Sequence, residues 1–264
     1  MATGANRLSW IVDEVVRLRP LLSGSLPRLT YGLLFKCLYF PRDTEVSQNI
    51  VLRNLTDLLS GLLLDLRRQV ESKATESGPA LIEAVRQAER VAKASKRGTH
   101  VLLCDALSIP EYLFLFHSFC IDRQNAFFAV NPSGKTATFK YLAQNYLKVP
   151  VPEGEELIMR TVAEGLAKKL GASCHRPFRG LDDLIHSTAE EGFETLEGMI
   201  DALFEAVEKL RRDILKLCGG RSSVLVLADH GYDVIPKGGK FFLTHGWLIG
   251  RECASPFVPI LVIR

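Results

Sequence analysis

The sequence predicts an α/β fold, in which a mostly parallel sheet has helices on both faces and follows an all-helical N-terminal region. Two observations lead to this prediction. Short, continuous apolar runs at 100–107, 125–130 and 222–231 are typical of strands buried on both faces. From residue 98 onward these runs alternate with longer segments of helical character, which is the pattern of parallel strands connected by helices.

Residues 1–97 read as helices. The segment 7–18 has apolar residues at helical spacing and stops before a proline, and 45–72 is a long amphipathic stretch. A further helix is expected over 77–98, with a serine as its cap, a proline in its first turn and a glycine at its end. No glycine-rich motif or polar cluster in this region indicates chemistry.

Residues 98–264 read as alternating strands and helices. In chain order we expect a strand at 100–107, a helix at 110–120, a strand at 125–130, helices at 136–147, 153–171 and 196–217, a strand at 222–231, a turn and strand at 237–246, and a final strand at 257–264. The chain therefore divides, by this interpretation, into a helical region (1–97) and an α/β domain (98–264).

Composition and charge exclude some classes of protein. The net charge of +3 does not indicate nucleic acid as a partner, although a nucleic acid substrate stays possible. The six cysteines form no C-x-x-C pair and read as buried free thiols of a reducing compartment. Acids interrupt the N-terminal segment, unlike a signal peptide, and the apolar run 29–40 is too short to span a bilayer. We expect a cytoplasmic protein without membrane attachment.

Polar groups follow the three expected buried strands. Asp105 follows the first strand, the turn 131–136 follows the second, and Asp229 with His230 follows the third. Ligands of such sheets bind beyond the carboxyl ends of the strands. These positions therefore mark the expected site.

The segment 129–136, "AVNPSGKT", has three interpretations. It ends like a nucleotide-binding P-loop, but Ala129 replaces the first glycine and Pro132 removes one N–H donor. It is alternatively a turn that caps a helix. The third interpretation is that Thr136 or Ser133 presents a nucleophilic hydroxyl at a helix N-terminus, where a phosphate is favoured. A metal ion would activate such a hydroxyl.

Candidate metal ligands lie in four segments of the chain. Asp182 and His186 are four residues apart and share one face of a helix if helical. With Asp105, the Asp229–His230 pair and His245, they form a carboxylate and imidazole set that suits Zn²⁺, Mn²⁺ or Fe²⁺.

The order of these groups resembles the alkaline phosphatase superfamily, and within it the PglZ domain. The resemblance covers about residues 98–264 and rests on the segments 102–112, 131–144, 224–232 and 244–263. It implies an alkaline-phosphatase-like core and a phosphohydrolase that acts on phosphomonoesters or phosphodiesters through two divalent ions, Zn²⁺ or Mn²⁺.

The resemblance also implies a role for each residue. The first ion would be held by Asp105, Thr136, Asp229 and His230, and the second by Asp182, His186 and His245. Thr136 would be both ligand and nucleophile and would carry the phosphoryl group before its hydrolysis. Lys135 would contact the phosphoryl group, or it would lie exposed on the helix face.

Two departures from the family pattern leave alternatives open. The turn has one additional residue before Thr136, so Ser133 is the alternative nucleophile. PglZ domains usually have a Tyr-x-His pattern followed by an aspartate, so Asp183, Glu190 or Glu191 is an alternative to Asp182. The alternative function is a non-catalytic or regulatory scaffold, connected with phage defence, that binds one ion or uses the N-terminal helices to bind a protein partner. A P-loop NTPase is the third hypothesis.

Overall fold

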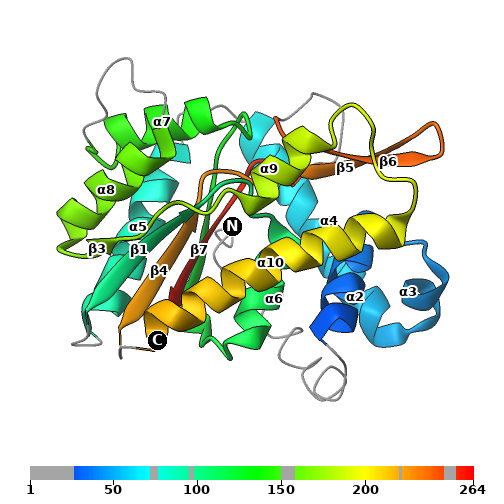
Figure 1. Cartoon of the computed structure of the whole chain (residues 1–264), viewed down its shortest axis with the longest axis horizontal. Coiled ribbons are helices and arrows are strands. Elements are labelled where there is room, and N and C mark those ends of the chain that lie inside the picture. Colours follow the sequence, from blue (N-terminus) through cyan, green and yellow to red (C-terminus); the bar gives the residue numbers. More distant parts are fainter. Residues whose placement is uncertain (1–26, 72–76, 95–97, 150–157, 220–221, 247–253) are drawn as a thin grey trace.

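A central sheet with helices packed on both of its faces forms the body of the protein (Figure 1). The computed structural model describes residues 27–71, 77–94, 98–149, 158–219, 222–246 and 254–264. The helix expected over 7–18 lies outside these residues. The structure is thus α/β, as the alternation of apolar runs and amphipathic segments predicts.

The sheet has five strands in the order β2-β7-β4-β1-β3. Strand β1 pairs in parallel with β3 and β4, whereas β7 pairs antiparallel with β2 and β4. The strands are β1 (Thr99–Cys104), β2 (Ala126–Val130), β3 (Ser173–Cys174), β4 (Ser223–Ala228) and β7 (Phe257–Ile263).

The sheet is therefore mixed: β1, β2, β3 and β4 run the same way, as expected of a mostly parallel sheet, but two of the four strand pairings are antiparallel. The final strand, β7, runs against both of its neighbours. It is buried along its whole length, so its continuous apolar pattern is the same in either direction and gives no sign of its orientation.

A two-stranded hairpin stands apart from the sheet. Its strands, β5 (Asp233–Lys237) and β6 (Lys240–Thr244), pair antiparallel, and Gly238 and Gly239 in the turn both have positive φ. The sequence predicts the turn and the second strand of this hairpin, but not the first.

One face of the sheet packs against a large core built from helices of both halves of the chain. In Figure 1, α10 crosses this face of the sheet in front of α6. The helices with residues in this core are α2 (Pro27–Tyr39), α3 (Thr44–Gln48), α4 (Ile50–Glu71), α6 (Ile109–Ser118), α9 (Gly180–Ser187) and α10 (Leu196–Cys218).

The opposite face packs against a second core. Alternate residues of the strands supply it: Val101 and Leu103 of β1 point here, whereas Leu102 and Cys104 belong to the first core. Its helices are α5 (Ser77–Ala94), α7 (Thr136–Asn145) and α8 (Ile158–Leu170), and a short 3₁₀ turn, η1 (Arg123–Asn125), leads into β2.

The helices before residue 97 are joined to the sheet through these two cores. Tyr31 and Phe35 of α2 lie in the first core, and Leu81 and Ala88 of α5 lie in the second. The chain thus places helices from this region on opposite faces of one sheet. The division into two domains at residue 97 stays a prediction. None of the helices in the described part of the chain has the length and apolar character needed to cross a membrane.

Candidate metal centre

The site is built where three strands end. Strand β7 is antiparallel to both β2 and β4, and β4 is parallel to β1, so β1, β2 and β4 point the same way. Their carboxyl ends therefore share one edge of the sheet, as the sequence predicts. Asp105 follows β1, the turn that leads into α7 follows β2, and Asp229 and His230 follow β4.

Asp229 and Thr136 are in direct contact at this edge. Thr136 Oγ1 donates a hydrogen bond of 2.7 Å to Asp229 Oδ2 and lies 3.4 Å from His230 Nε2. The other carboxylate oxygen of Asp229 accepts from the backbone N–H groups of His230, at 2.9 Å, and Ala106, at 3.3 Å. Asn131 Nδ2 donates to the carbonyl of Asp229 at 2.8 Å, which ties the turn after β2 to the end of β4.

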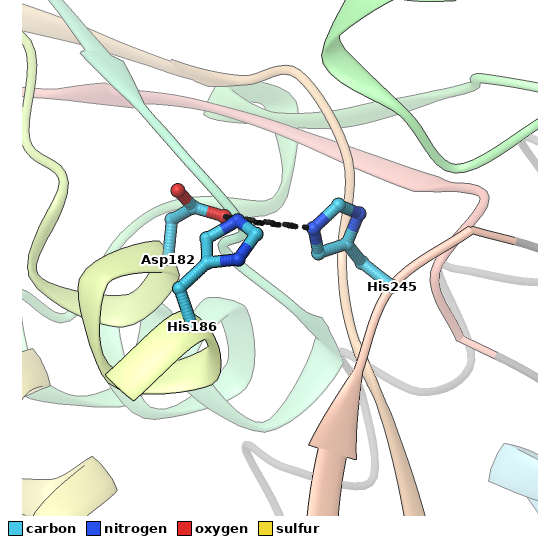
Figure 2. A group of neighbouring side chains, drawn as sticks. All are labelled: Asp182, His186 and His245. Atoms are coloured by element: carbon cyan, nitrogen blue, oxygen red, sulfur yellow. Dashed lines mark hydrogen bonds and ion pairs between the residues drawn. The ribbon is translucent and has the colours of Figure 1, made fainter. Parts of the chain in front are cut away.

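Asp182, His186 and His245 form a second group at the same edge (Figure 2). Asp182 and His186 face the same way from α9, as their spacing predicts, and His186 Nε2 lies 3.3 Å from Asp182 Oδ1. His245 follows β6 and places its Nε2 atom 3.8 Å from the same oxygen and 3.5 Å from His186 Nε2.

Asp182 also belongs to another group of possible metal ligands, with Asp105 and His230. These three residues and the group of Asp182, His186 and His245 are the two candidate ligand groups. His230 Nε2 lies 3.6 Å from Asp105 Oδ1. The rings of His230 and His245 stack with centroids 4.7 Å apart, so the two groups adjoin one another. The geometry differs here from the expected division, because Asp182 lies between the groups and not in one of them alone.

Burial and like charge perturb the acids of this centre. The pKa of Asp105 is raised to about 8, first because burial removes water from its carboxylate and then because Asp229 and Asp182 repel its charge. Burial likewise raises the pKa of Asp229 to about 7. Burial lowers the pKa of His230 and of His245, so both rings favour the neutral form that binds metal.

These residues suit a divalent cation. Each of the two groups brings three carboxylate or imidazole donor atoms within 4.8 Å of one another. Asp105 Oδ1 is buried and has no hydrogen-bond partner among the described residues. A buried acceptor without a donor, beside two other carboxylates, is unfavourable unless a cation satisfies it. The oxygen and nitrogen donors agree with Zn²⁺ or Mn²⁺.

The alternative residues lie elsewhere or face other partners. Ser133 Oγ donates to Thr138 Oγ1 at 2.6 Å, so its hydroxyl is engaged with the first turn of α7 and not with the carboxylates. Asp183 is exposed and lies 3.7 Å from Arg179. Glu190 and Glu191 are exposed beyond the end of α9. The geometry therefore favours Thr136 over Ser133 and Asp182 over its alternatives.

Lys135 is exposed and its aliphatic chain lies against Gly246. A Cβ atom at Gly246, which has φ +90°, would come within 2.8 Å of Lys135 Cε. The lysine thus packs across the residue after His245. The described residues that line the cavity at this edge include Thr136 but not Lys135.

The sequence analysis does not predict two of the residues that lie at this centre. Arg179, at the start of α9, lies 3.9 Å from Asp105 and 3.6 Å from Asp182. Asn131 is fully buried and also donates to the carbonyl of Lys135 at 2.9 Å. The signal for Arg179 is its position three residues before Asp182. Asn131 lies inside the segment "NPSGKT", where its short side chain reads as an ordinary turn residue.

A cavity of about 730 Å³ opens at this edge. Asp105, Thr136, Asp182, His186 and His245 line one part of it. These four candidate ligands and the candidate nucleophile are thus accessible to a small molecule, whereas Asp229 and His230 are fully buried behind them.

In comparisons with models of known protein families and with curated proteins, the chain has no match. The resemblance to the PglZ domain therefore stays a prediction that rests on the motifs and their order.

Proposed function

We propose that the protein is a metal-dependent phosphohydrolase that attacks phosphomonoesters or phosphodiesters with the Thr136 hydroxyl. The observation that supports this most strongly is the 2.7 Å hydrogen bond from Thr136 Oγ1 to Asp229 Oδ2, beside two groups of metal-binding donors. A hydroxyl with a proton acceptor at this distance, next to divalent cations, is what nucleophilic phosphoryl transfer requires.

The residues around Thr136 have distinct tasks in this proposal. Thr136 is the first residue of α7, so the free N–H groups of the first turn favour a phosphate in front of it. Asp229 accepts the hydroxyl proton and is itself held by the N–H groups of Ala106 and His230. Asn131 donates to the carbonyls of Lys135 and Asp229 and so holds the turn before α7 beside the end of β4.

Two divalent ions would complete the site. Asp105, Asp182, His186, His230 and His245 would hold them with Asp229. When bound, the ions would neutralise charge on the phosphoryl oxygens and lower the pKa of the attacking hydroxyl. The resemblance of 98–264 to PglZ domains supports the same class of reaction, and a cytoplasmic location remains part of the proposal.

The first test compares two hydroxyls of the same turn. Protein loaded with Zn²⁺ or Mn²⁺ should contain about two ions per chain by elemental analysis. It should hydrolyse p-nitrophenyl phosphate or bis-p-nitrophenyl phosphate and lose this activity with a chelator. Thr136→Ala should lower kcat by about 10³-fold or more and retain at least one ion, because the nucleophile is lost but most ligands remain.

Ser133→Ala is the matched control and should change kcat by less than about threefold, since its hydroxyl bonds Thr138. If Ser133→Ala abolishes turnover and Thr136→Ala does not, the nucleophile is assigned to the wrong residue. If neither ester is hydrolysed and one ion or none is bound, a non-catalytic scaffold replaces this proposal, with the N-terminal helices as the surface for a partner.

A further inference from the structure

The part of the cavity wall that supplies no candidate ligand is basic. Arg160 of α8, His175 and Arg176 of the segment between β3 and α9, and Arg179 at the start of α9 all line it. Apart from Asp105 and Asp182 of the candidate metal centre, Glu164 is the acid among the described lining residues. This wall therefore carries an excess of positive charge once ions neutralise the aspartates.

The arginines differ in how far their charges are already paired. Arg160 Nε donates to Glu164 Oε1 at 2.8 Å, one turn along the same helix, and both side chains are exposed. Arg179 makes longer approaches to Asp105, Asp182 and Asp183, between 3.6 and 3.9 Å. No ion pair to Arg176 is present within the described ranges. Exposed pairs of this kind are weak and exchange easily for a stronger partner.

A single phosphoryl group at Thr136 would not account for all of the arginines in this wall. Arg179 is close to the candidate ligands and lies where it would face a phosphate held there. Arg160 and Arg176 belong to other elements of the cavity wall. A cavity of about 730 Å³ also has the size of sites for whole small molecules, not for one phosphate.

We propose that this cavity selects substrates that carry a second phosphate group, with Arg176 and Arg160 as the residues that determine this specificity. The inference rests on the proposed phosphohydrolase function and deepens it. The planar guanidinium group of arginine matches a phosphate with two parallel hydrogen bonds, which makes it the side chain suited to this task. The apolar side chains of Met159 and Pro177 in the same lining would contact the part of the substrate between the two phosphates.

The test uses two ligands that differ by one phosphate, adenosine 5′-monophosphate and adenosine 3′,5′-bisphosphate. Metal-loaded protein should favour the bisphosphate by about tenfold to 100-fold in kcat/KM for phosphate release, as a charge-assisted contact to phosphate allows. Arg176→Ala and Arg160→Ala should each reduce this preference several-fold, and the double variant should remove most of it. Arg53→Ala is the control, because Arg53 is exposed on α4, away from the cavity.

The same ligands separate this inference from the proposed function. If neither these compounds nor the two p-nitrophenyl esters are hydrolysed, the proposed reaction fails, and calorimetric titration of the metal-loaded protein with each adenosine compound then tests the second phosphate site alone. Equal affinity for the two compounds would overturn the inference even if turnover is observed. A preference that persists unchanged in the double variant would overturn the assignment to these two arginines.

Discussion

Two clusters with buried carboxylates lie beside the segment that follows β4. The first surrounds Glu111, and the second contains Asp105, Asp182 and Asp229. The carboxylate oxygens of the two clusters differ in their hydrogen-bond partners. Glu111 of α6 is fully buried, and its Oε1 atom accepts hydrogen bonds from the hydroxyls of Tyr31 and, at 2.6 Å, Tyr232. Its Oε2 atom accepts from the backbone N–H of Ser108 at 3.1 Å. In contrast, Asp105 Oδ1 has no hydrogen-bond partner in the described part of the chain.

The surroundings of the two clusters explain their different roles. Neutral donors fill both oxygens of Glu111, so no further cation is required there, although burial still raises its pKa. Asp105 has two further carboxylates as neighbours, and their repulsion adds to the rise of its pKa. A buried acid is therefore informative about function when its acceptor atoms are unfilled and its neighbours carry the same charge.

The largest effect should follow from a change in the second cluster. Asp229→Ala removes the partner of Thr136 and a candidate ligand, so we expect loss of bound metal and a fall in activity of about 10³-fold or more. Elemental analysis and the phosphoester assay measure the two effects. Retained turnover in this variant would refute the assignment of the centre, and with it the contrast between the clusters.

A change in the first cluster should affect stability and not metal content. Glu111→Ala leaves the hydroxyls of Tyr31 and Tyr232 without their buried acceptor and should lower the free energy of unfolding by about 2–4 kcal/mol. Denaturant titration measures this loss. Tyr31→Phe is the milder matched variant, with an expected loss of about 1 kcal/mol. If Glu111→Ala protein is stable but binds no metal, Glu111 is not a purely structural carboxylate.

A third change should affect stability with the opposite sign. Without metal, the native state holds the Asp105 proton up to about pH 8, whereas an unfolded aspartate loses it near pH 4. The native state thus binds more protons across this window, and its stability falls as the pH rises through it. Asp105→Asn should remove this cost and stabilise the metal-free protein at pH 8 by about 1–3 kcal/mol.

The two buried histidines change the stability in the opposite direction as the pH rises. Burial lowers the pKa of His230 and His245, so their contribution to stability increases as the pH rises toward the ordinary histidine value near 6.5 and is constant above it. Thermal unfolding of metal-free protein between pH 6.5 and 8 therefore excludes the contribution of these two histidines and reports on the buried acids, Glu111 included. A wild-type protein whose stability rises over this range would contradict the raised pKa values of Asp105 and Asp229.

Much of the site was predictable because it depends on strand ends and on local spacing. Asp105, the turn before Thr136 and the Asp229–His230 pair each follow a continuous apolar run, and parallel strands bring such ends to one edge. The interval between Asp182 and His186 is a helical interval, which local sequence also reveals.

The remainder depends on contacts that leave no local pattern. The direction of β7 is not encoded in its apolar run, and β3 has only two residues, Ser173 and Cys174, both exposed. Glu111 receives its hydroxyl donors from residues 80 and 121 positions away in the chain. The approach of Arg179 to Asp105 likewise depends on how α9 packs beside the end of β1, which the tertiary structure alone determines.

The hairpin of β5 and β6 leaves the body of the protein just after His230 and returns at His245. The two imidazoles stack where the hairpin begins and ends, so both ends of the hairpin meet at the candidate metal centre. Ions bound by these histidines would hold these two ends together, and the amide protons of β5 and β6 would then exchange with solvent more slowly in loaded protein. Amide exchange in β5 and β6 would thus report whether the candidate centre is occupied, although neither strand supplies a ligand.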